Sequence, residues 1–587
     1  MRKTSTNLLR LILLAGLLLV PYSGIADDAT SAEGDDGANQ GDRVELSLGG
    51  WDASVEGSPE QAAEYEPTDG GLELDLEALG LRDWGHFAIA VHSRDSDDYG
   101  ATLDFDVNRS LRSHTEVTGL VHRLGHDPLE NLEAATNHGR VVYHTDLDPL
   151  RAYEITYSQL IHRTELQPRR APALTLGFDY RLQEREGHRQ ALVVSHCDAC
   201  HVVSQSRPID QRTQDAGVDA AVAWAGGSAR VSFDHRTFEE DTPFITLLFD
   251  DALHPELRVP IFDNRLQWDS AQGPQPVHAI PEIEKNVGKV AFVFDDVGGF
   301  VVTLDGVWST TENETTGLEA DYQGATVSAV RVFGDNRLRW RARTLSIESD
   351  EAFIDIAEPV AIAGPQAGRT YREIYGFDPD FLRRSSLDRQ VLESRLELSH
   401  RLGKKAGTVR LAWDFESTDR DFYEVAPGET ETTENIVGLS WNARPRKGLR
   451  LSGSYRHGAI DHPFALVNGA FSTLVSPSVP NPFAPAGAQY YEFQNARIAD
   501  TTASPESWDE FKLGLSRIFD DQSLLSASYR HWDGDNDDGD FTNWSKTSQS
   551  ATVSYFAMPA PTWQWHLAYT WHDSELIFPT FIPIFDG

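Results

Sequence analysis

Period-two alternation of apolar and polar side chains runs through this 587-residue chain from about Val44 to its end. The alternating segments are roughly ten residues long, and turns rich in Gly, Asp, Asn and Pro separate them. In one segment, Val409, Leu411, Trp413 and Phe415 share a face, and small, polar or charged residues occupy the other. Because β-branched and aromatic residues are enriched in these segments, the pattern predicts strands with one apolar face and an all-β fold.

Helix signals are few. The segment PLENLEAATNHG (128–139) is the best candidate and predicts a short surface helix. The segment DLEALGLRDW (75–84) is a weaker helix prediction.

A large transmembrane antiparallel β-barrel of about 20–26 strands, spanning residues 43–587, fits these segments best. Many segments have nine to eleven residues, the length that a tilted strand needs to cross a bilayer. Tryptophans sit at segment ends, as in interfacial girdles: Trp413, Trp441, Trp508, Trp532, Trp544, Trp563, Trp565 and Trp571. No fixed repeat of a propeller or solenoid is visible. The alternative is that these aromatic residues pack a soluble β core.

The N-terminus predicts export. Arg2, Lys3 and Arg10 precede an apolar run over residues 11–20, and small residues lead to Ala26. We interpret residues 1–26 as a signal peptide and residues 27–42 as a disordered acidic leader. With the barrel pattern, export predicts the outer membrane of a Gram-negative bacterium.

Charge narrows the classes of partner. The chain has a net charge of −40, and removal of the signal peptide would bring it to about −43, which argues against nucleic acid. Five aspartates lie between Asp533 and Asp540, in an order that partly resembles a calcium loop. Trp544 stands where such a loop carries glutamate, so the segment reads as a solvated loop, with weak Ca²⁺ binding as the alternative.

The most specific motif is CxxCH. Cys197 and Cys200 are the only cysteines, and His201 follows them directly. This spacing is the attachment site of one covalent c-type haem, with two thioethers from the cysteines and His201 as the proximal iron ligand. A structural zinc site would need four ligands, and the chain has no second cysteine pair to complete one. A CxxC disulfide or redox pair is the alternative.

A second axial ligand is expected to be histidine. Met558 is the only methionine besides the initiator and lies far from the motif, whereas 13 of 20 histidines fall between His86 and His254. The leading candidates are His188 and His144, and His138, His126 and His122 are others. His196 is badly placed to reach round to its own haem. No nucleophile elbow, zincin helix or phosphate-binding glycine loop appears, so we expect an electron-transfer or porin protein and no enzyme.

Two blocks of sequence carry a family resemblance. Residues 120–160 and the segment SHCDACHVVSQSR (195–207) resemble the MtrB/PioB family, the porin sheaths of porin–cytochrome conduits. The resemblance implies an outer-membrane barrel, in contact with lipid, that houses or docks periplasmic or outer-surface multihaem c-type cytochromes in extracellular electron transfer. In that family a CxxC lies near the mature N-terminus. Here it comes about 170 residues into the mature chain, in a segment near 186–210, and His201 follows it, which implies a barrel with its own redox centre.

Two other functions stay open at this point. One is a soluble periplasmic c-type haem protein or enzyme on an all-β scaffold. The other is a diffusion porin or transporter in which CxxC forms only a disulfide.

Overall fold

A computed structural model of the chain describes residues 42–52, 54, 56, 70–94, 98–129, 143–194, 201–248, 273–350, 352–354, 368–369, 373, 381–383, 388–420, 431–463, 504–537, 544–560 and 562–578. The predicted signal peptide and most of the leader lie outside these residues.

The first half of the chain carries strands β1 Arg43–Trp51, β2 Gly71–Arg82, β3 Gly85–Ser93, β4 Tyr99–Val107, β5 Leu111–Leu124, β6 Tyr143–Asp146, β7 Tyr153–Leu166, β8 Leu174–Val194, β9 His201–Trp224, β10 Gly227–Glu240, β11 Ile245–Leu247, β12 Gln275–Val277 and β13 Ile283–Val297. The second half carries β14 Phe300–Asn313, β15 Leu318–Phe333, β16 Asn336–Ser349, β17 Ala352–Ile354, β18 Phe381–Arg383, β19 Arg389–Gly403, β20 Gly407–Asp419, β21 Glu431–Arg446, β22 Leu449–Asp461, β23 Ser507–Ile518, β24 Leu524–Asn536, β25 Trp544–Ala560 and β26 Trp563–Ile577.

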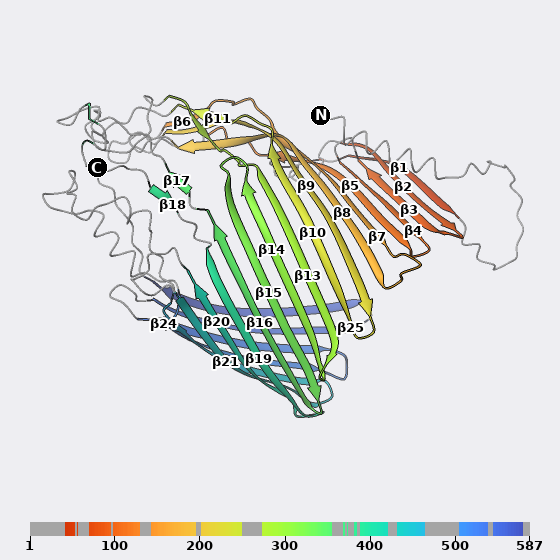
Figure 1. The fold of residues 1–587 in the computed structure, drawn as a ribbon, viewed down its shortest axis with the longest axis vertical. Helices are drawn as coiled ribbons and strands as arrows, with labels where there is room; N and C mark the ends of the chain where they lie inside the picture. The colour runs from red at the N-terminus through yellow and green to blue at the C-terminus, as the bar shows by residue number, and fades with distance from the viewer. Residues whose placement is uncertain are drawn as a thin grey trace, which may run out of the picture.

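One large sheet contains 22 of these strands (Figure 1). Strands follow one another as an antiparallel meander from β1 to β26. The exception is β6, which pairs in parallel with the N-terminal end of β9. Two small two-stranded sheets, β11–β12 and β17–β18, lie in connections.

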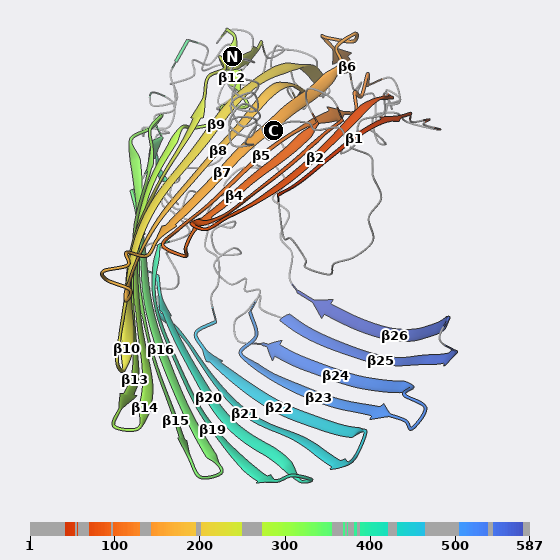
Figure 2. The same cartoon turned by 90° about the vertical axis from the view of Figure 1, so that its right-hand side faces the viewer.

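The sheet curves strongly, as Figure 2 shows, and its two ends approach across an open gap. Among the described residues, β1 pairs only with β2 and β26 pairs only with β25. The predicted all-β antiparallel architecture and the predicted range of strand number are confirmed. Closure of the sheet into a barrel stays a prediction.

Of the two helix predictions, one is wrong and the other falls mostly outside the described residues. The one for residues 75–84 is wrong, because most of that segment is strand β2. Leu74, Leu76, Ala78 and Gly80 share one face at a spacing of two residues, and this alternation outweighs the helix propensity of the segment. Most of the predicted helix at 128–139 lies outside the described residues. Within the part of the chain that the structure describes, no helix is both long and apolar enough to cross a membrane.

Cross-strand register gives the sheet one apolar and one polar face. Directly paired residues on six successive strands form an apolar row: Leu338, Leu398, Leu411, Leu439, Tyr455 and Phe511. One residue along, the opposite face carries a polar row: Arg337, Ser399, Arg410, Ser440, Ser454, Lys512, Arg530, Ser550 and His572. Successive side chains of a strand point to opposite faces, so the sheet keeps this division over many strands.

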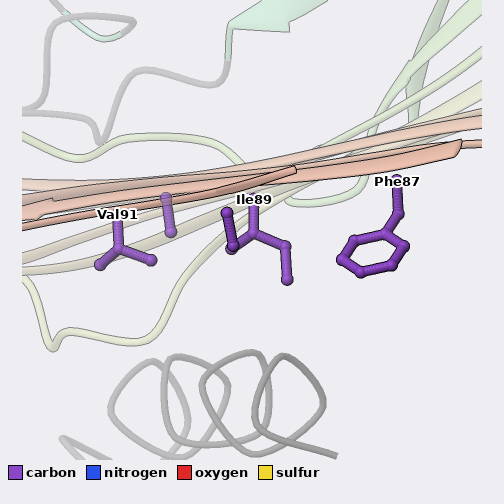
Figure 3. Close-up of a cluster of buried hydrophobic side chains, with 5 residues drawn as sticks. Phe87, Ile89 and Val91 are labelled. Carbon is purple, nitrogen blue, oxygen red and sulfur yellow. The ribbon is translucent and has the colours of Figure 1, made fainter. Parts of the chain in front are cut away.

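Burial shows which face lies inside the curve. Leu411 and Leu439 on the apolar face are each 52% exposed, whereas Glu397 and Glu510 on the polar face are 8% and 4% exposed. The polar face is therefore the enclosed one, the reverse of a soluble β-sandwich. Toward the N-terminal edge, Phe87, Ile89 and Val91 on the apolar face form a buried cluster with Ala78 and Ala101 (Figure 3).

The two ends of the strands differ in their connections. At one end, strands are joined by short turns, for example at 225–226, 298–299, 334–335 and 447–448. At the other end, long connections run over 241–282, 350–388 and 462–506. We call these the short-turn side and the long-connection side.

Candidate haem hairpin

The CxxCH motif belongs to the longest hairpin of the sheet. Strands β8 and β9 have 21 and 24 residues, and they pair without interruption from Leu174↔Val222 to Val194↔Val202. Cys197 and Cys200 lie in the connection outside the described residues, and His201 is the first residue of β9, with its side chain outside them. Seven residues separate the last paired residues, Val194 and Val202, so the connection is long enough for the whole motif.

The apolar face is interrupted well before the tip of this hairpin. On β8, Leu176, Phe178 and Leu182 lie on the apolar face, and Glu184, Glu186 and His188 continue the same face. Val194 lies ten residues beyond Glu184, so at about 3.3 Å per residue β8 extends about 33 Å along the strand past the segment that ends at Leu182. Because β8 ends on the long-connection side, the connection that contains the motif joins the two strands at the far end of a projecting arm on that side.

Strand β6 holds the upper part of this arm. The pairing of β9 with β10 stops at Gln211, and β6 pairs with residues 201–204 on the same edge of β9. Ser204, which is fully buried, donates from its Oγ to Asp146 Oδ1 at 2.8 Å and receives a hydrogen bond from Gln190 Nε2 at 3.0 Å. The backbone N–H of Leu147 donates to the carbonyl of Ser204 at 2.9 Å.

Asp146 is the centre of this contact. Its Oδ2 lies 2.6 Å from His126 Nε2, and the His126 ring meets Tyr153 edge-on at 4.9 Å between centroids. Burial opposes ionisation, but the hydrogen bonds from Ser204, the Asp148 backbone and His126 outweigh it and lower the pKa of Asp146 below 3.8. Asp146 is therefore a carboxylate at neutral pH that links β6, β9 and the segment after β5.

The two leading candidates for the second haem ligand lie at different distances from His201 along β9. His188 pairs with Pro208, seven residues along β9, which is about 23 Å from His201 along the strand. The pKa of His188 is lowered by burial and by Arg151, so this imidazole is neutral. His144 pairs with Val202, and Tyr143 pairs with His201, so strand alternation sets His144 on the face opposite to His201. Neither residue is the register partner of His201 in the described backbone, and the assignment of a second haem ligand to either of them stays a prediction.

His126 is placed differently. It contacts Asp146, whose register partner Ser204 is three residues, about 10 Å along the strand, from His201. Sequence reasoning named His126 only among the secondary candidates and missed Asp146 and Ser204 entirely. No local pattern marks these residues, since the contact depends on a parallel pairing across 58 residues of chain.

The other candidate sites also have defined places. Asp533 and Asp535 lie on β24, where they accept hydrogen bonds from Thr547 and Ser507, and residues 538–543 lie outside the described part. Ca²⁺ binding there stays a prediction. In the described residues, one other group has the composition of a metal site: Glu73, Asp75 and His92, on β2 and β3.

Comparisons with known proteins give distant likenesses. No family model and no curated protein matches the sequence. Among solved structures, the chain is similar to a mutant of the ferric enterobactin receptor PfeA from Pseudomonas aeruginosa, at 8% identity and a TM-score of 0.41, over 88% of this chain and 74% of the receptor. It is similar to the unliganded ferric citrate transporter FecA at 8% identity and a TM-score of 0.33, over 91% and 78%. The corresponding values for the RagAB peptide transporter are 10%, 0.39, 86% and 71%. Likeness at this level says nothing of what this chain binds, and the resemblance to the MtrB/PioB family stays a prediction.

Asp146→Asn should loosen β6 from β9. Loss of the charge-assisted hydrogen bonds should cost about 1–3 kcal/mol, so the Leu147 amide should exchange with deuterium about tenfold faster or more. In the wild-type protein, the lowered pKa means that ionised Asp146 stabilises the contact above pH 3.8 and that this stabilisation is lost as the pH falls through the folded pKa. Hydrogen exchange of the peptide around residues 143–150 measures both effects.

The matched control is Asp104→Asn, because Asp104 also pairs with a histidine, His114 at 2.7 Å, but on β4 away from the hairpin. If the Leu147 amide exchanged at the same rate in Asp146→Asn, in Asp104→Asn and in the wild type, Asp146 would not anchor β6 to β9.

Proposed function

We propose that this protein is an outer-membrane β-barrel that carries one covalent c-type haem and forms part of an electron conduit across the outer membrane. The observation that carries the proposal is the position of CxxCH, the only cysteine pair, at the end of an arm about 33 Å beyond the apolar segment of the sheet. Electron transfer is the function, and no bond chemistry by side chains is required.

The exposed apolar face supports a membrane setting. Large apolar side chains such as Leu398, Leu411 and Leu439 are 43–52% exposed, and they lie in register across neighbouring strands. A soluble protein rarely exposes an apolar surface of this extent, whereas a transmembrane barrel requires it. In lipid every backbone N–H and C=O needs a partner, so the sheet must close at its two open edges.

The residues at the hairpin fit a c-type haem. Cys197 and Cys200 would form the thioethers and His201 would be the proximal iron ligand. The haem would supply a one-electron redox centre. The residues around Ser204 and Asp146 would hold the start of β9, and therefore His201, in a fixed position.

A single haem cannot carry electrons across the membrane. The hydrocarbon core alone is about 30 Å thick, and the arm lies on one side of it. The remaining redox centres would therefore come from multihaem c-type cytochromes that dock at this arm or enter the barrel. Because long connections are extracellular in bacterial barrels, we place the haem on the outer surface.

The two alternative functions make different demands. A soluble periplasmic haem protein would have to cover the apolar face, and the described part of the sheet leaves most of it exposed over β9–β26. A diffusion porin with a CxxC disulfide would carry no haem. The first two experiments below separate these functions.

Haem attachment is tested with denaturing gels stained for peroxidase activity. Protein from cells with a c-type maturation system should stain at the position of the full chain, and Cys197→Ser with Cys200→Ser should abolish the stain. Stain that persists in the double variant, or none in the wild type, would refute covalent haem at this motif.

The lipid-facing role of the apolar face is tested with adjacent residues of β21. Leu439→Arg places a charge on the apolar face and should destabilise the membrane-inserted protein by about 2–4 kcal/mol. Ser440→Arg places the same charge on the polar face and should cost less than about 1 kcal/mol. Denaturant midpoints in lipid vesicles provide the comparison, and equal effects would count against a lipid-facing surface.

For the second axial position we propose His126. Carboxylates that hydrogen-bond one ring nitrogen commonly orient a ligating histidine, and Asp146 holds His126 in this way. His126→Ala should change the visible absorption spectrum of the oxidised protein from six-coordinate low spin to high spin. His144→Ala and His188→Ala should leave it unchanged, and a change confined to either of these would transfer the role to that residue.

A further inference from the structure

A recess with an unusual charge lies on the polar face of the sheet, away from the haem hairpin. It has a volume of about 940 Å³ and spans strands β19 to β25 toward the short-turn side. Two paired rows of residues form its floor. One contains Arg410, Ser440, Ser454, Lys512, Arg530 and Ser550, and the other contains Thr408, Asn442, Ser452, Gly514 and Ser528.

Among the described residues that line the recess there is no carboxylate, and six are cationic: Arg401, Lys404, Arg410, Arg444, Lys512 and Arg530. This is an exception in a chain with a net charge of −40. At other places on the sheet, cations pair with carboxylates across strands, as in Arg343 with Glu393 at 3.2 Å and Lys289 with Asp234 at 3.1 Å.

Two buried carboxylates on the same face of the sheet pair with three of the cations. Glu510 is 4% exposed and receives hydrogen bonds at 2.7 Å from both Lys512 Nζ and Arg530 Nε. Arg410 Nε lies 3.2 Å from Oε1 of Glu397, which is also buried. These pairs hold the three cationic heads in place, while about half of each side chain stays exposed.

The other three cations are not neutralised. For Arg401, Lys404 and Arg444, the described residues provide no ion pair with a carboxylate. The recess therefore has six positive charges against two buried negative ones, and its serine and asparagine side chains add neutral hydrogen-bond donors. Concentrating cations on a concave surface costs electrostatic energy unless an anion binds there.

We propose that this recess binds a multivalent oxyanion, a molecule that carries several carboxylate or phosphate groups. Arginine forks and lysine ammonium groups form strong charge-assisted hydrogen bonds with these groups. The recess borders the turn between β19 and β20, so the anion enters from the short-turn side, opposite to the haem arm. This site is separate from the haem, and a chain without Cys197 and Cys200 should bind the same anions.

The test uses the full-length protein in detergent micelles at low ionic strength, with citrate as the carboxylate probe and inorganic pyrophosphate as the phosphate probe. Isothermal titration calorimetry should detect one site for at least one probe. The variant Arg401→Gln, Lys404→Gln, Arg444→Gln should weaken binding about tenfold or more, and added NaCl should weaken binding to the wild type. These three substitutions leave intact the ion pairs that Glu397 and Glu510 form with Arg410, Lys512 and Arg530.

The matched control removes three arginines from other short turns: Arg109→Gln, Arg169→Gln, Arg170→Gln. It has the same loss of charge on the same side of the sheet and should keep wild-type affinity. Binding of pyrophosphate alone, or of citrate alone, supports the site and identifies the ligand class. Absence of binding to the wild type, or equal weakening in the two triple variants, overturns the proposal. Cys197→Ser with Cys200→Ser separates the two proposals, since it removes haem attachment and leaves the recess unchanged.

Discussion

Backbone pairing in strict register is the constraint on which the rest of this structure depends. Each antiparallel ladder fixes which residues lie side by side, so the alternation within one strand becomes a continuous face across many strands. Leu398, Leu411 and Leu439 are adjacent only because their strands pair without a slip. A shift of one residue would bring Arg410 onto the apolar face and Leu411 onto the polar one. The apolar surface, the polar recess and the projecting arm all follow from this register.

Sequence reasoning found what local alternation encodes and missed what distant pairing creates. The all-β class and the range of strand number were predictable because Val409, Leu411, Trp413 and Phe415 repeat at a spacing of two. The helix predicted at 75–84 is wrong because the prediction followed the helix-favouring composition of the segment, whereas its alternation, which continues from Leu74, forms β2. The parallel pairing of β6 with β9 was not predictable, since the four residues of β6 have no distinctive pattern. The contact of Asp146 with Ser204 and the position of His144 beside Val202 depend on that pairing, whereas the β8–β9 hairpin sets the position of His188.

The haem arm and the oxyanion recess divide the proposed functions between two ends of the sheet. The arm is stiffened where a hairpin of this length would otherwise be a free two-stranded ribbon, because β6 replaces β10 as the neighbour of β9 near the tip. An electron carrier gains from such stiffness, since a fixed haem position sets the distance to a docked partner. The recess has a different basis, because two buried carboxylates, Glu397 and Glu510, hold three of its six cations and need no contact with the arm.

The parity of the meander has a topological consequence. Without the short branch β6, the main sheet has 21 strands among the described residues, each antiparallel to the next. An odd number makes β1 and β26 run in the same direction, whereas single-chain bacterial barrels with even numbers close through an antiparallel seam. A direct seam between these two strands would be a parallel ladder with slanted hydrogen bonds. Because of the same parity, β1 starts at Arg43 on the short-turn side and β26 ends at Ile577 on the long-connection side. The first residue of the sheet and its last residue therefore lie on opposite sides.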